Sequence, residues 1–322
     1  MILPYLFILS SIFLWMLYPP LSNTVLNTVS VDQSAFLMHG TAAFFITVIA
    51  IFYLKRDTLY VLKNLNTKLF SYIILSGFLI FSSHILLFKA LSLSNEYDIL
   101  SIIIFESWPI FTFILNNKIR LKKKSNLIEY SLIFLSFFGF ILLMLPSLNN
   151  NITEINEKFL IVSVYSLLGA LSMSLNCLSR VIIINRVGSI DGIKLSSLKL
   201  GIITEFFVRI ISVVFFAGLL TFKGQEIIVS NIELETLGVI IFIGIFILII
   251  GSILYDLAIY KSNTSNLIVL WYIIPIGSIM YFILFDNIYP TFLETLACLC
   301  IISSNILLNS YKKIIKRIKI WV

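Results

Sequence analysis

Apolar runs of about 18 residues or more recur along the whole chain, and each is long enough to cross the hydrocarbon layer of a membrane as a helix. Only 12% of the 322 residues are charged, whereas soluble domains carry about 25%. So few charges exclude a soluble protein with a large core. The sequence therefore predicts an all-α polytopic membrane protein.

The hydropathy pattern predicts ten transmembrane helices, and the connections between them are too short to hold a soluble domain. The residues at the start are read as a retained helix, because a basic start and a small-residue cleavage site are both missing. The seventh segment is the least regular, because Lys199, Glu205 and Arg209 interrupt it. The ten predicted segments are 2–27, 34–54, 69–93, 99–117, 125–146, 158–183, 194–221, 236–260, 265–285 and 290–310.

Most of the 23 basic residues fall in connections on one side of this arrangement. They include "NKIRLKKK" after the fourth segment, Arg180 and Arg186 near the end of the sixth, and the tail "YKKIIKRIKIWV". The positive-inside rule then places both termini on the cytoplasmic side. The membrane is expected to be a bacterial-type inner (plasma) membrane. The tail contacts anionic lipid or only anchors the orientation, and we favour the anchor.

Composition also limits which partners and cofactors we expect the protein to bind. The net charge of +7 could suggest a nucleic-acid partner, but membrane orientation explains the basic residues, so we expect no nucleic acid. Three cysteines lie in apolar segments without a CxxC pair, so neither a disulfide framework nor a zinc site is indicated. We expect no metal and no other cofactor. The expected partners are a small-molecule substrate and the lipid bilayer, and a homodimer is left open.

A short pattern occurs twice. "ALSLSN" (90–95) and "AIYKSN" (258–263) each precede an apolar stretch with a lone proline, Pro109 or Pro275. The pattern predicts two repeats, 1–147 and 148–311, followed by a basic tail at 312–322. Five is an odd number of helices, so tandem halves enter the membrane from opposite sides. Many secondary transporters have such inverted repeats, with the binding site near the midplane between them.

These features resemble the drug/metabolite transporter superfamily, EamA type. The resemblance rests on "FLW" at 13–15 and on the Ala-Leu-x-x-Ser turn before a helix that contains proline. "SWPIFTFILNN" (107–117) and "GALSMSLNCLSRVIIINR" (169–186) are most similar to the bacterial aromatic amino acid exporter branch. The resemblance implies a central cavity between helices one to four and six to nine, peripheral helices five and ten, and efflux of amino acids or related metabolites.

The chain departs from the family pattern at several places. Asn116-Asn117 and Asp286-Asn287 stand where the halves of EamA proteins usually close their fourth helix with Gly-Glu. Met16 replaces a common glycine, and Glu106 stands where the exporter branch has an uncharged residue. These differences bear on the substrate more than on the fold.

Glu106 is the first candidate site residue, because a charge inside the membrane usually faces a cavity and marks a pathway. It could hold a substrate amine or carry the coupled proton, or it could pair with a buried basic residue on another helix. Pro109 and Pro275 are candidate helix kinks, which are as often architectural as functional.

Two histidines and three aromatic residues complete the candidates. His39 and His84 could bind substrate or relay protons, and packing histidines are the alternative. Trp15, Trp108 and Tyr272 fall on helices that line the cavity of the resembled family and could stack a ring or hold a cation. Trp271, beside Tyr272, could instead belong to the interfacial aromatic belt.

Other charges inside segments have structural interpretations. Glu205 and Arg209 are four residues apart and are expected to pair on one helix face. Asp256 lies near a helix end, close to Lys261, and Lys89 can extend its ammonium group to the interface.

The leading functional interpretation is a secondary transporter that works by alternating access. No phosphate-binding GxxxxGK[ST] motif occurs, so a gradient or exchange would supply the energy. The alternatives are a channel or membrane scaffold without carrier activity and, less favoured, a membrane-embedded enzyme. We do not expect an enzyme, because two histidines without a paired-acid motif leave little material for catalysis.

Overall fold

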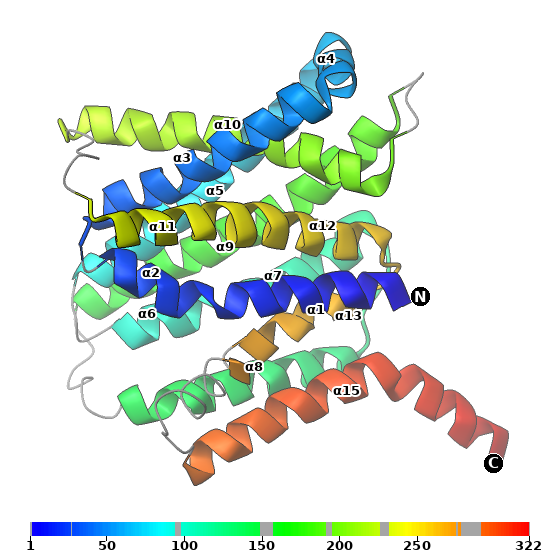
Figure 1. The fold of residues 1–322 in the computed structure, drawn as a ribbon. Coiled ribbons are helices and arrows are strands. Elements are labelled where there is room, and N and C mark those ends of the chain that lie inside the picture. The colour runs from blue at the N-terminus through cyan, green and yellow to red at the C-terminus, as the bar shows by residue number, and fades with distance from the viewer. Residues whose placement is uncertain are drawn as a thin grey trace.

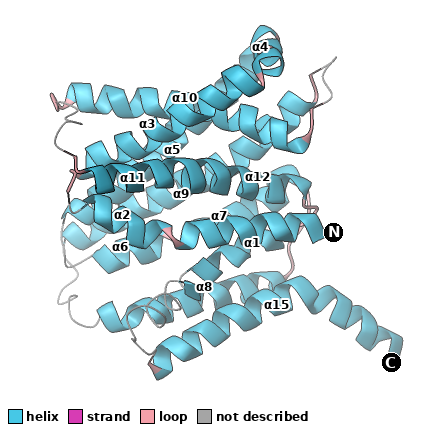
Figure 2. Ribbon diagram, viewed as in Figure 1, coloured by secondary structure: helices cyan, strands magenta, loops and turns pink. Residues whose placement is uncertain are grey.

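The computed structural model describes residues 2–26, 28–93, 98–148, 157–190, 195–225, 232–274, 276–277 and 291–321. These residues form helices joined by short loops, with no β-strand among them (Figure 2). Six helical stretches are long and apolar enough to cross a membrane: 31–53, 67–90, 158–188, 197–222, 234–261 and 292–310. The prediction of an all-helical chain with membrane-length apolar helices is therefore confirmed.

The first half of the chain contains five predicted segments and an additional short helix. Its helices are α1 (Ile2–Met16), α2 (Tyr18–Leu26), α3 (Val31–Val48), the π-helical η1 (Ile49–Tyr53), α4 (Lys55–Lys63), α5 (Thr67–Leu93), α6 (Asp98–Phe105), α7 (Trp108–Leu115), the π-helical η3 (Asn116–Arg120) and α8 (Leu127–Leu148).

The second half begins with two long unbroken helices. Its helices are α9 (Glu157–Gly188), α10 (Ser197–Phe222), α11 (Leu234–Phe242), the π-helical η4 (Ile243–Gly251), α12 (Ser252–Lys261), α13 (Asn266–Val269), the 3₁₀-helical η5 (Leu270–Ile273) and α15 (Phe292–Trp321). Pro275 and the rest of the predicted ninth segment beyond 277 lie outside the described residues, as do Asn95 and Asp286-Asn287.

Two predicted segments are broken where proline removes a backbone donor. The first is divided at Leu17, just before Pro19-Pro20, and the fourth at Glu106–Ser107, just before Pro109. Proline cannot donate the hydrogen bond of a helix interior but is tolerated in the first turn, so each new helix starts directly before a proline.

The basic residues after the second predicted segment are expected from the sequence to lie in a loop between membrane helices. Most of them instead lie in the short helix α4. Asp57 lies in its first turn and Lys63 in its last turn, where each charge is favourable with respect to the helix dipole. Lys199 at the start of α10 contacts Asp57 at 2.8 Å. A sequence too polar for a membrane span thus forms a short helix at the end of the bundle.

The long helices lie side by side in a bundle, and both chain ends lie at the same end of it, together with α4 (Figure 1). α5 packs along α9, α10 packs against α3 and α5, and α1 packs against α12 and η4. α8 and α15 pair with each other at one edge of the bundle. Large apolar side chains on the outside, such as Phe52 and Leu299, remain exposed, as expected for a surface that faces lipid.

Two glycines allow close helix crossings. A Cβ atom at Gly77 of α5 would lie 2.5 Å from the Cγ2 atom of Ile211 on α10, and one at Gly244 of η4 would lie 2.9 Å from that of Thr41 on α3. Small residues let membrane helices approach closely, and the resulting van der Waals contact replaces the hydrophobic driving force that lipid removes. These crossings fix the separation of the central helices.

Gly77→Ala and Gly244→Ala should each destabilise the protein by about 1–3 kcal/mol, the usual cost of overpacking. The midpoint of thermal unfolding in detergent measures this effect. Gly218→Ala is the matched control, because no atom lies within 4 Å of a Cβ at that helical position. Equal midpoints for Gly77→Ala and Gly218→Ala would show that the crossing does not need glycine.

Candidate functional site

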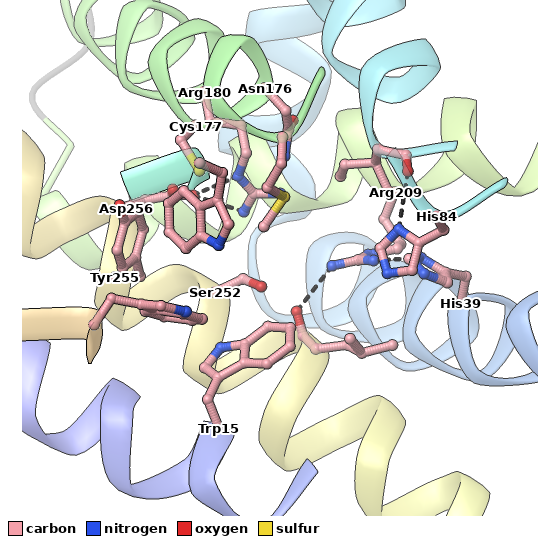
Figure 3. Close-up of a pocket in the computed structure, with 15 residues that line it drawn as sticks. Trp15, His39, His84, Asn176, Cys177, Arg180, Arg209, Ser252, Tyr255 and Asp256 are labelled. Atoms are coloured by element: carbon pink, nitrogen blue, oxygen red, sulfur yellow. Dashed lines mark hydrogen bonds and ion pairs between the residues drawn. The ribbon is translucent and has the colours of Figure 1, made fainter. Parts of the chain in front are cut away.

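A small cavity lies among helices from both halves of the chain (Figure 3). Its walls come from α1, α3, α5, α7, α9, α10, η4, α12 and η5, and its volume is about 40 Å³. This is space for one or two water molecules, each of which occupies about 30 Å³ in the liquid. Any larger ligand therefore requires the helices to separate.

A chain of buried ion pairs borders the cavity. Arg180 on α9 donates from Nε to the Oδ2 atom of Asp256 on α12 at 2.7 Å, and from Nη2 to Glu205 on α10. Glu205 also accepts from Arg209, one turn later on α10, with 2.8 Å between Oε1 and Nε. The four side chains are at most 3% exposed. Two positive and two negative charges thus balance one another inside the bundle.

Arg209 extends this network to two further helices. Its Nη2 atom donates to the carbonyl oxygen of Leu248 on η4 at 2.9 Å, and its Nη1 atom lies 2.6 Å from Nδ1 of His39 on α3. A guanidinium group has only donors, so the Nδ1 atom of His39 accepts. His39 is therefore neutral and carries its proton on Nε2.

His84 on α5 has the opposite tautomer. Its Nδ1 atom lies 2.9 Å from the carbonyl oxygen of Ile80, which can only accept, so this nitrogen carries the proton. The Nε2 atom of a neutral His84 is then an acceptor. The two imidazole rings lie edge to face with centroids 4.8 Å apart. Among the described residues, no group of three His, Cys, Asp or Glu side chains could hold a metal.

Aromatic rings form the part of the wall opposite the histidines (Figure 3). The Trp271 ring centroid lies 5.0 Å from that of Trp108, 5.4 Å from that of Tyr255 and 5.5 Å from that of Trp15. Within the described residues, the Nε1 atom of Trp15 and the hydroxyl of Tyr255 are buried without a hydrogen-bond partner. The thiol of Cys177, a weak partner, lies near that hydroxyl.

Four of the predicted substrate-binding residues line this cavity, namely Trp15, His39, His84 and Trp108. Glu106 and Tyr272 are not among its lining residues. Glu106 lies in the break between α6 and α7, beside the Trp108 side chain, and its carbonyl oxygen accepts from the Tyr272 hydroxyl at 3.0 Å. Tyr272 packs against Phe137 and Phe140 of α8. Glu106 and Tyr272 therefore lie outside the cavity wall.

The structure corrects the interpretation of Arg180 and Asp256 and extends that of Glu205 and Arg209. Arg180 does not belong to a basic connection: it is 3% exposed and lies two turns before the end of α9. Asp256 pairs with Arg180. Glu205 and Arg209 do pair, as their spacing predicts, but they also join α9, α3 and η4. A signal was present in the sequence, because Arg180 is followed by the apolar residues 181–184 and so sits inside the helical run.

No family model and no curated protein matches the chain. Solved structures do match. One of them, named only "Crystal structure of protein", has a TM-score of 0.74 and 14% sequence identity, over 96% of this chain and 96% of that chain. At this identity the likeness shows that the two share a fold over nearly their whole length.

The tautomers of the two histidines can be tested without a ligand. The chain has only two histidines, so nitrogen-15 histidine labelling of protein purified with a tag free of histidine gives two assignable rings. We expect the Nε2–H form for His39 and the Nδ1–H form for His84 in NMR spectra near neutral pH. Arg209→Met should release His39 to a mixture of tautomers and leave His84 unchanged. A wild-type His39 ring protonated on Nδ1 would rule out this hydrogen-bond network.

Proposed function

We propose that this protein is a secondary transporter of small organic metabolites, with amino acids and related compounds as the class that the resemblance implies. It works by alternating access between two inverted five-helix halves and resides in a bacterial-type inner membrane with both termini in the cytoplasm. One observation carries the proposal. Three buried charges and two histidines, drawn from five helices of both halves, line a small cavity inside an apolar bundle, and Glu205 pairs with two of these charges. Ionisable groups inside a membrane are expensive and usually mark a transport pathway.

The two close glycine crossings support the inverted repeat. Gly77 of α5 meets Ile211 and Ser212 of α10, and Gly244 of η4 meets Thr41 and Ala42 of α3. The glycines are 167 residues apart (244 − 77), and Ile211 and Ser212 are each 170 residues after their counterparts (211 − 41 and 212 − 42). The same crossing thus occurs twice, with the roles of the two halves exchanged.

The helix pairings also occur twice, with the roles of the two halves exchanged. α5 packs along α9 in the way that η4 and α12 pack along α1, and α10 packs on α5 in the way that α3 packs on η4. Two pairs, α3 with α10 and α8 with α15, join equivalent helices of the two halves. These pairings support a pseudo-two-fold axis in the membrane plane.

The cavity lies on that proposed axis. His39 and Arg209, which contact each other at 2.6 Å, are also 170 residues apart (209 − 39). Ile80 and His84 on α5 line the cavity at the positions that Leu248 and Ser252 occupy 168 residues later (248 − 80 and 252 − 84). The π-helical turn of η4 accounts for the one-residue change of offset after Gly244, since a π-helix inserts one residue into an α-helical run.

A polar contact closes the bundle at the end that carries the termini. Arg120 of η3 donates to two carbonyl oxygens, that of Tyr260 in the last turn of α12 at 3.0 Å and that of Ser262 just after α12 at 2.7 Å. Beside it, the Ser265 hydroxyl accepts from Asn116 at 2.6 Å and donates to Asn117 at 2.7 Å. We call this set of contacts the latch. It joins the two halves, so opening the cavity toward this end requires it to break.

The alternatives receive less support. A channel needs a continuous pore lined by repeated polar or charged rings, whereas the latch closes one end of the bundle. A purely structural scaffold explains the buried ion pairs but gives no reason for a cavity lined by Arg180, Asp256 and Arg209 together with two histidines. A membrane-embedded enzyme needs a nucleophile and a base in contact, and the two histidines are engaged with Arg209 and with a backbone carbonyl.

Cys177 reports on opening of the cavity, since it lines the wall and is only 5% exposed. With Cys298 and Cys300 replaced by serine, Arg120→Ala should increase the rate of alkylation of Cys177 by a water-soluble maleimide by about tenfold, because the lost latch bonds favour the open state. Lys118→Ala is the control, since it removes a charge from an exposed side chain of the same helix. Equal rates in the two variants would refute a latch.

Carrier kinetics test the function itself. A compound that raises the thermal stability of the purified protein should enter proteoliposomes in a saturable manner and be accelerated by the same compound on the other side. Non-saturating flux would exclude a carrier.

Glu106, the proton-coupling candidate, is tested in the same assay. Glu106→Gln removes the ionisable group and keeps the shape of the side chain, so it should abolish the dependence of transport on the pH gradient if Glu106 carries the proton. An unchanged pH dependence would assign coupling to another residue.

A further inference from the structure

We infer that the cavity selects an uncharged planar solute, namely a heteroaromatic or aryl compound that carries an amide-type group with one hydrogen-bond donor and one acceptor. The inference rests on the proposed function only in calling this cavity the substrate site. Among small organic metabolites it favours uncharged compounds over the zwitterionic amino acids that the resemblance implies. Charge balance, the aromatic wall and the two histidine tautomers each contribute one part of the argument.

The buried charges already neutralise one another. Arg180 contacts both Asp256 and Glu205, and Arg209 contacts Glu205. A ligand with a net charge would bring an uncompensated charge into this buried site. A zwitterion would have to separate Arg180 from Asp256 to find two partners. Breaking a buried pair leaves charges unpaired in a low-dielectric interior, which is strongly unfavourable. An uncharged ligand leaves all four side chains as they are.

The aromatic wall provides the site for a planar ring. The rings of Trp15, Trp108, Tyr255 and Trp271 surround one side of the cavity, with successive centroids 5.0 to 5.9 Å apart. Aromatic pairs at this separation prefer edge-to-face or offset arrangements, which a further ring can join.

Among the described residues, the indole nitrogen of Trp15 is buried in this wall without a hydrogen-bond partner, and the hydroxyl of Tyr255 has only the weak Cys177 thiol nearby. The Tyr255 residue is 5% exposed. Buried polar groups are nearly always hydrogen-bonded, so orphaned donors of this kind point to a missing acceptor. Gly251 lets Trp15 approach, because a Cβ atom there would lie 2.9 Å from the indole nitrogen. A ring nitrogen or carbonyl oxygen of a ligand would supply the acceptor.

When both rings are neutral, the two histidines offer one hydrogen-bond donor and one hydrogen-bond acceptor. Arg209 fixes His39 with a proton on Nε2, and the Ile80 carbonyl fixes His84 with an acceptor on Nε2. A primary amide has one carbonyl acceptor and N–H donors, so it can satisfy both nitrogens, whereas a carboxylate only accepts. Once the helices separate to admit it, a ligand with a ring toward the tryptophans and an amide toward the histidines matches both ends of the cavity.

Matched compounds that differ in charge test the inference. Nicotinamide is compared with nicotinate, and indole-3-acetamide with indole-3-acetate, by calorimetry and thermal stability on the full chain at neutral pH. L-tryptophan serves as the zwitterionic competitor. Each amide should bind at least about tenfold more tightly than its carboxylate, a difference of about 1.4 kcal/mol. Equal or tighter binding of a carboxylate or of tryptophan, or binding of neither amide, overturns the inference.

A charge variant should change this preference. Asp256→Asn keeps the side-chain volume but leaves Arg180 with excess positive charge, so indole-3-acetate should gain affinity by about tenfold or more relative to indole-3-acetamide. If Asp256→Asn does not fold, Arg180→Met with Asp256→Leu removes one whole pair and leaves Glu205 with Arg209. This double variant should bind both compounds more weakly and still prefer the amide. Continued rejection of the carboxylate by folded Asp256→Asn, or a carboxylate preference in the double variant, contradicts the role of charge balance.

Failure of this inference and failure of the proposed function give different results. Amide binding without saturable entry into proteoliposomes would remove the transporter and leave a site for uncharged ligands. Saturable, trans-stimulated transport of a charged compound, with no amide preference, would keep the transporter and remove the inference.

Discussion

The rest of the structure depends on the chain of buried ion pairs from Asp256 through Arg180 and Glu205 to Arg209. Inside a lipid-facing bundle, water is not available to solvate a charge that lacks a partner, so each of these groups needs another helix at a defined distance. The network therefore specifies the relative positions of α9, α10 and α12. Through His39 and the Leu248 carbonyl it also holds α3 and η4.

Close packing and polar contact act together in this arrangement. Gly77 and Gly244 allow the backbones of α5 and α10, and of η4 and α3, to approach closely, and Arg209 on α10 contacts both His39 and Leu248. In lipid, apolar burial between helices stabilises less than in water, so small residues and interhelical hydrogen bonds contribute more of the specificity. The close glycine crossing occurs twice, whereas all four charged residues of the network lie in the second half of the chain.

The bundle contains two separate sets of polar contacts, one beside the cavity and one at the end that carries the chain termini. The set beside the cavity keeps its charges paired, while the latch at the end of the bundle joins Arg120 and Asn116 to the turn before α13. Asn116 and Asn117 stand where the resembled family usually has Gly-Glu, and here they contact Ser265. This departure from the family pattern thus acquires a structural role, in the contact between the halves.

The sequence by itself determined the class of protein, the course of the long helices and the pairing of Glu205 with Arg209. These properties depend on hydropathy and on spacing along one helix, which are local. It also identified four residues of the cavity wall, Trp15, His39, His84 and Trp108.

Only the tertiary structure decided which helix faces meet. Successive residues of a 3₁₀-helix such as η5 point about 120° apart, so Trp271 faces the cavity while its neighbour Tyr272 packs against α8. Arg180 and Asp256 are 76 residues apart, and no local pattern links them. Their contact depends on how α9 and α12 are rotated about their own axes. That rotation is set by the packing of the whole bundle, because a buried charge is tolerated only where another helix brings its counterion.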